Sequence, residues 1–170
     1  MNGGFMNATE HLVEQYVRHV LNWFTITNIK FGNREIDILA IDTKGKAYQI
    51  EVDMHKGGLQ WGPGGNDGYT VRQYKQKKFD AKTKDFIRKK FGLRKTKDIW
   101  VCWGIHPKCR RAVRKSAKES KVIIWEVKTM LKKFLDEVGT TKYEDDITQT
   151  LSVLKSVAQC GSQCSGFNEK

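Results

Sequence analysis

Residues 33–53 read NREIDILAIDTKGKAYQIEVD, and this stretch decides the fold. Two apolar runs, 36–41 and 47–52, flank residues 42–45, which have the Asp and Gly composition of a tight turn. The stretch therefore predicts two antiparallel strands joined by a hairpin. The first strand carries Asp37, and the second carries Glu51 and Asp53. Acidic residues are uncommon in buried strands, so their presence here indicates a site.

The side chains of a strand alternate between its two faces, which places Glu51 and Asp53 on one face together with Gln49. If the hairpin brings Asp37 beside Glu51, the carboxylates converge. Carboxylate oxygens are the ligands that Mg²⁺ prefers, so the stretch predicts a magnesium site in which Mn²⁺ substitutes.

The rest of the chain is strongly basic. Its 170 residues suit one domain with an appendage, and its net charge of +12 indicates a polyanionic partner, most often nucleic acid. A hydrophobic content of 39% is enough for a core and excludes a disordered basic tail. No apolar run approaches the roughly 20 residues that a membrane span needs, and the N-terminus lacks the pattern of a signal peptide. We expect a cytoplasmic protein without a membrane partner.

Helical and strand patterns alternate along the chain, which predicts an α/β fold with a central mixed sheet flanked by helices. The expected elements are a helix from residue 10 to about 24, a strand at 25–31, the hairpin, a helix at 71–91, a strand at 98–104, a helix at 107–118, a strand at 122–127, and helices at 129–138 and 143–157. We expect one domain over residues 1–127, a C-terminal helical extension over 128–158 and a flexible tail over 159–170.

Two segments after the hairpin have features of a nucleic-acid surface. Residues 55–70 are rich in Gly and predict a mobile loop, whose Trp61 can stack on a base or cover the edge of the core. Between residues 72 and 97, twelve Lys or Arg face only two Asp, which favours a surface that follows phosphates. The candidate binding residues here are Arg72, Lys75, Lys77, Lys78 and Lys82.

The order of these elements resembles the PD-(D/E)xK nuclease superfamily, which has the restriction-endonuclease-like fold. The shared features are a helix with Glu10, a strand with Asp37, a strand with Glu51 and Asp53, and then a basic helix. The resemblance covers about residues 8–127 and is nearest to Mrr-like restriction proteins and archaeal Holliday-junction resolvases. It implies a restriction-endonuclease-like core and metal-dependent hydrolysis of DNA.

The resemblance also implies roles for individual residues. Asp37 matches the first metal-binding Asp of the motif, and Glu51 matches its second acid. Glu10 resembles the helix-borne Glu that completes the metal site in several branches, with Glu14, one turn further on, as its competitor. Gln73 is a further candidate, because the helix after the motif often directs a polar side chain back to the site.

The chain departs from the family pattern at residue 53, where Asp53 replaces the usual Lys. Three explanations stay open. Asp53 can act as an acidic variant that binds metal or takes a proton. A basic residue from elsewhere, with Lys56 and Lys75 as candidates, can replace the missing Lys. Alternatively, the site is weak or inactive.

These observations lead to one main functional hypothesis and two alternatives. The main one is a Mg²⁺-dependent DNA endonuclease of restriction or resolvase type. The first alternative is an inactive nuclease-fold protein that serves as a nucleic-acid-binding module, and the second is an interaction protein whose basic face docks an acidic partner. The sequence does not exclude RNA as the nucleic acid. The apolar positions of the C-terminal helices are compatible with a homodimer.

Overall fold

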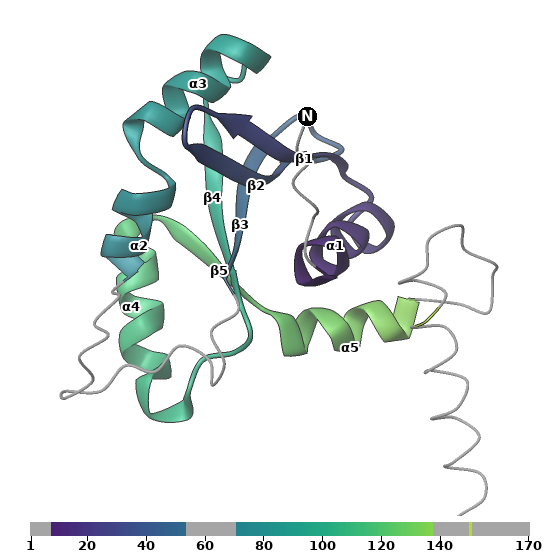
Figure 1. Cartoon of the computed structure of the whole chain (residues 1–170). Helices are drawn as coiled ribbons and strands as arrows, with labels where there is room; N and C mark the ends of the chain where they lie inside the picture. Colours follow the sequence, from purple (N-terminus) through teal and green to yellow (C-terminus); the bar gives the residue numbers. More distant parts are fainter. Residues whose placement is uncertain (1–7, 54–70, 138–149, 151–170) are drawn as a thin grey trace, which may run out of the picture.

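A five-stranded mixed β-sheet forms the centre of the computed structural model, which describes residues 8–53, 71–137 and 150 (Figure 1). The strands lie in the order β1-β2-β3-β4-β5, antiparallel from β1 to β3 and parallel from β3 to β5. Helices cover both faces, so the expected α/β fold with a mixed, helix-flanked sheet is confirmed.

The antiparallel half is built from the stretch that the sequence singles out. Strands β1 (Phe24–Phe31), β2 (Arg34–Ile41) and β3 (Ala47–Asp53) follow one another through short turns. Gly45 closes the second turn with φ of +75°, a conformation that favours glycine, and its N–H donates to the Asp42 carbonyl. The predicted hairpin is therefore confirmed, with Ile38 opposite Ile50 in its register.

The parallel half needs crossover helices, because parallel neighbours cannot be joined by a tight turn. Strand β3 is followed by α2 (Val71–Lys78) and α3 (Ala81–Phe91) before β4 (Thr96–Cys102). The short 3₁₀ turn η2 (Pro107–Cys109) and α4 (Arg110–Ser120) then lead to β5 (Val122–Glu126).

The predicted single helix over residues 71–91 is wrong, because the chain breaks into α2 and α3 at Phe79 and Asp80. Asp80 is extended and caps α3: its carboxylate accepts a hydrogen bond from the Thr83 N–H at 2.9 Å. Arg34 also donates to the Asp80 carboxylate at 2.5 Å, which joins the cap to β2. At the other end of α3, Gly92 takes the left-handed conformation and ends the helix, as its position predicts.

The helices divide between the two faces of the sheet (Figure 1). Helices α1 (Ala8–Gln15) and α5 (Val127–Glu137), with the π-helical turn η1 (Tyr16–Val20), pack on the face that presents Ile38 and Ile50. Helices α2 and α4 pack on Trp100 and Cys102 of the opposite face, and α3 packs on Leu39. Residues of β3 that alternate with Ile50 therefore point toward α2 and α3.

Helix α5 contributes to the core: Met130 and Phe134 lie in the same buried cluster as Ile38 and Ile50. The expected division of the chain at residue 127 stays a prediction. The glycine-rich segment 55–70, the helix expected at 143–157 and the tail at 159–170 lie outside the described residues. Within the described part of the chain, no helix has the length and apolar character to cross a membrane.

Candidate active site

Asp37 and Glu51 meet where β2 and β3 separate. The paired register ends at Ile38 and Ile50, so Asp37 and Glu51 would form the next pair on the face that α2 and α3 cover. Here a side chain takes the place of a strand carbonyl: the Val52 N–H donates to Asp37 Oδ2 at 2.7 Å. This bond draws the Asp37 carboxylate toward β3, which confirms that the predicted hairpin brings it beside Glu51.

Glu51 is fully buried, which is unusual for a carboxylate. Its Oε1 accepts a hydrogen bond from Gln49 Nε2 at 2.8 Å, whereas its Oε2 accepts none within the described structure. Burial, followed by repulsion from Asp37, raises the pKa of Glu51 to about 8. Burial therefore opposes ionisation of Glu51, and positive charge placed beside it favours the ionised form.

Lys78, at the last residue of α2, brings a positive charge to these acids. Its ammonium lies 3.0 Å from Glu51 Oε2, and the two groups form an ion pair. Burial lowers the pKa of Lys78, but the charges of Glu51, Asp37 and Asp53 outweigh this effect and raise it overall. Sequence reasoning placed Lys78 only in the basic surface and missed its contact with the acids.

The other side chains near the pair add negative charge and a hydroxyl. Asp53 ends β3, and its charge, together with that of Glu35, helps to raise the pKa of Asp37, although burial is the main cause. The buried Tyr74 hydroxyl has no hydrogen-bond partner among the described residues. Burial and the charges of Glu51, Asp53 and Asp37 raise the pKa of Tyr74, so this hydroxyl stays protonated.

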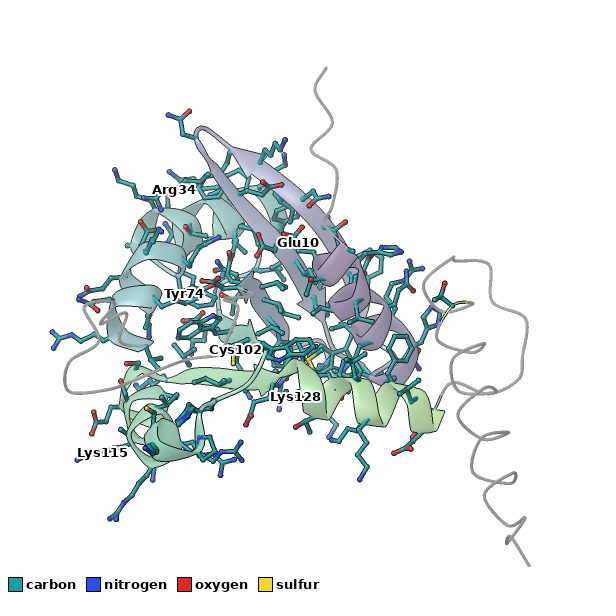
Figure 2. All side chains as sticks on the ribbon, turned by 60° about the horizontal axis from the view of Figure 1, so that its bottom comes forward. Glu10, Arg34, Tyr74, Cys102, Lys115 and Lys128 are labelled. Atoms are coloured by element: carbon teal, nitrogen blue, oxygen red, sulfur yellow. The ribbon has the colours of Figure 1, made fainter. Side chains whose placement is uncertain are left out.

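Neither Glu10 nor Glu14 forms a cluster with Asp37 and Glu51 that could hold a metal ion. Both belong to α1, which packs on the opposite face of the sheet (Figure 2). Glu14 accepts a hydrogen bond from Thr25 Oγ1 at 3.1 Å and lies within 4 Å of His11 and Arg18, which gives it a structural role. The proposed metal-ligand role of Glu10 stays a prediction.

Lys75, one of the two lysines expected to replace the missing positive charge, contacts other groups than the acid pair. Lys75 donates to the Ser120 carbonyl at 2.6 Å and lies 3.8 Å from Asp98, so it joins α2 to α4 and β4. Lys56 and Trp61 lie outside the described residues. Gln73 is exposed on α2, and its predicted contact with the site stays a prediction.

A divalent cation fits the acid pair in its chemistry. Asp37 and Glu51 offer carboxylate oxygens, and Glu51 Oε2 is a buried acceptor without a hydrogen bond. Mg²⁺ is commonly held by one or two carboxylates, with water and substrate phosphate completing its shell. Over residues 8–53 and 71–137, no three His, Cys, Asp or Glu side chains form a cluster able to hold a metal, so the fit rests on two protein ligands.

Exposed cationic side chains lie on the helices beside the pair. Arg72, Lys77 and Lys82 are exposed on α2 and α3. Helix α4 packs against α2 and exposes a further basic group, comprising Arg110, Arg111, Arg114, Lys115 and Lys118. Lys115 projects away from the molecule in Figure 2. A phosphate chain that reaches Lys78 would therefore meet positive charge on the neighbouring helices.

Comparison with known proteins identifies one family whose model covers more than half of the chain. A family model described as NERD, nuclease-related domain, matches residues 6–108. No protein of curated function matches the sequence. Among solved structures, the crystal structure of a repair endonuclease from Pyrococcus abyssi is similar, with 10% sequence identity and a TM-score of 0.43. The similarity covers 74% of this chain and 49% of that one, so the chain spans about half the length of that structure.

Proposed function

Because the chain belongs to the nuclease-related domain family, we propose that it is a metal-dependent endonuclease that hydrolyses phosphodiester bonds of DNA. The observation that carries this proposal is the convergence of two buried carboxylates and one ammonium group, from Asp37, Glu51 and Lys78, at one place on the sheet. Buried acids of this kind destabilise a fold unless a ligand compensates them, so their presence supports a functional site.

Each of the three residues has a role that follows from its chemistry. Asp37 and Glu51 would hold Mg²⁺ through their carboxylate oxygens. When bound, the ion would polarise the scissile phosphate and favour ionisation of a water molecule. Lys78 keeps a positive charge beside the acids and would stabilise negative charge that develops on the phosphate.

Lys78 also offers an explanation for the Asp at position 53. The charge that the PD-(D/E)xK pattern places on the strand itself would come here from the end of the next helix, 3.0 Å from Glu51. Asp53 would then act as a weak third acid or as a proton acceptor. Separate variants of Lys78 and of Asp53 distinguish the supply of positive charge by Lys78 from the acid or proton-acceptor role of Asp53.

Incubation of the protein with supercoiled, linear and branched DNA in Mg²⁺ or Mn²⁺ tests the proposal. We expect cleavage by the native chain and none by Asp37→Asn, which loses a negatively charged ligand but keeps the shape of the side chain. Glu119→Gln, an exposed change on α4, is the matched control. Absence of cleavage with every substrate, together with absence of Mn²⁺ binding, would overturn the proposal.

A second function, that of an inactive nucleic-acid-binding module, is favoured by one observation: only two protein ligands for a metal come together in the described structure. It predicts DNA binding that weakens steeply with salt and is unchanged in Asp37→Asn, because phosphate contacts set the affinity. RNA serves as a competitor polymer in the same binding assays. A measurement of the mass in solution tests for a homodimer.

A further inference from the structure

Behind Glu51 lies a buried polar network that the proposed reaction does not use. Gln49 is fully buried two residues before Glu51 on β3. Its amide oxygen accepts a hydrogen bond from Lys84 Nζ of α3 at 2.9 Å. Its amide nitrogen donates to Glu51 Oε1 at 2.8 Å and to the Lys78 carbonyl at 3.0 Å. Gln49 thus connects Lys84 to Glu51.

The chemistry of lysine determines which way the Gln49 amide points. An ammonium group has three hydrogens to donate and no acceptor, so only the oxygen of the amide can face Lys84. The amide nitrogen must then face Glu51. Rotation of the amide by half a turn would oppose its NH₂ to the Lys84 ammonium and its oxygen to the Glu51 carboxylate, and would break all three hydrogen bonds.

Lys84 is itself fully engaged. Its ammonium also donates to Thr96 Oγ1 at 2.8 Å and to the Asp98 carboxylate, so all three of its hydrogens have partners. Asp98 lies opposite Gln49 in the β3–β4 register and is buried. The network therefore runs from β4 through α3 to β3, and each member is held by partners on a different element.

We propose that Gln49 and Lys84 are positioning residues for Glu51: Lys84 orients the Gln49 amide, and the amide holds Glu51 Oε1 and so fixes the direction of the carboxylate that would bind a divalent cation. The inference rests on the proposed function, because it assumes that Glu51 is a metal ligand. Lys84 would influence the metal site through two successive hydrogen bonds without touching the site.

Mn²⁺ binding to the full chain without nucleic acid, measured by titration calorimetry or electron paramagnetic resonance, tests the proposal. We expect Lys84→Met to weaken Mn²⁺ binding by roughly 10-fold or more, as loss of a group that orients a metal ligand commonly does. The fold should persist, because Lys75 remains 3.8 Å from Asp98 as a counter-ion, and circular dichroism checks this. Lys89→Met, an exposed change on the same helix, should bind Mn²⁺ like the native chain.

A double-mutant cycle separates positioning from a general loss of structure. If Lys84 acts through the amide, then Lys84→Met should add nothing to the effect of Gln49→Leu on the affinity for Mn²⁺. If the effects of the two substitutions on the affinity for Mn²⁺ add in full, or if Lys84→Met binds Mn²⁺ with native affinity, the inference is overturned and the proposed function still stands. Absence of Mn²⁺ binding by the native chain would overturn the proposed function, and the inference with it.

Discussion

Replacement of Glu51 by Gln should stabilise the metal-free protein while removing its function. Glu51 is fully buried, and its pKa is raised from 4.5 to about 8, mainly by burial and then by repulsion from Asp37. Gln has nearly the same shape and carries no charge at any pH. The substitution therefore removes the cost of ionising a buried acid and leaves the packing of β3 nearly unchanged.

The sign and size of the effect follow from proton linkage. Between pH 4.5 and about 8 the folded chain keeps a proton on Glu51 that the unfolded chain has lost, so the free energy of unfolding falls as the pH rises through this range. At about 1.4 kcal/mol per pKa unit, the full difference corresponds to about 5 kcal/mol. With these two pKa values, we expect the stability advantage of Glu51→Gln to grow by about 3 kcal/mol between pH 5 and pH 8 and then to level off.

Urea denaturation in EDTA at pH 5, 6.5, 8 and 9 measures this difference. Glu119→Gln removes an exposed carboxylate and should stay within about 0.5 kcal/mol of the native chain at every pH. Addition of Mn²⁺ should raise the melting temperature of the native chain and leave that of Glu51→Gln unchanged. A stability difference that does not vary between pH 5 and pH 8 would refute the reasoning.

Three further substitutions have expected outcomes. Lys78→Met should lower the rate of DNA cleavage about 100-fold or more and leave Mn²⁺ bound, because it removes only the positive charge. A native rate in a plasmid-cleavage assay would exclude Lys78 from the reaction. Asp80→Ala should lower the free energy of unfolding by about 1–2 kcal/mol, because α3 loses its cap and Arg34 loses its partner; urea denaturation measures this, and a change below about 0.3 kcal/mol would contradict it. Phe134→Ala should cost about 3–5 kcal/mol by the same measurement, because Phe134 is 1% exposed; a loss under about 1 kcal/mol would mean that α5 is not part of the core.

The hairpin and its acids could be predicted from sequence because the signals there are local. Alternation places Gln49, Glu51 and Asp53 on one face, and the turn at Gly45 sets the register that brings Asp37 opposite Glu51. The resemblance to PD-(D/E)xK nucleases depends on this same stretch, and the family match over residues 6–108 confirms it.

Other features of the structure depend on long-range packing, which the sequence pattern does not show. Periodicity shows that α1 is amphipathic but cannot show which face of the sheet it covers, and this face determines the surroundings of Glu14. Lys78 looks like its neighbours in a run of lysines, and only the docking of α2 distinguishes it. The break between α2 and α3, by contrast, has a local signal: Asp80 lies three residues before Thr83, which is the spacing of a helix cap.

The ring stack between Tyr74 and Trp100 makes the docking of α2 observable by spectroscopy. The two rings lie 3.8 Å apart between centroids and 8° from parallel, and Trp100 is the register partner of Glu51 on β4. Any motion that withdraws Lys78 from the acids by moving α2 also separates these rings. Because the chain has five Trp, the difference between its fluorescence and that of Trp100→Phe isolates this signal. An intrinsic optical reporter is thus built beside the candidate active site and needs no added label.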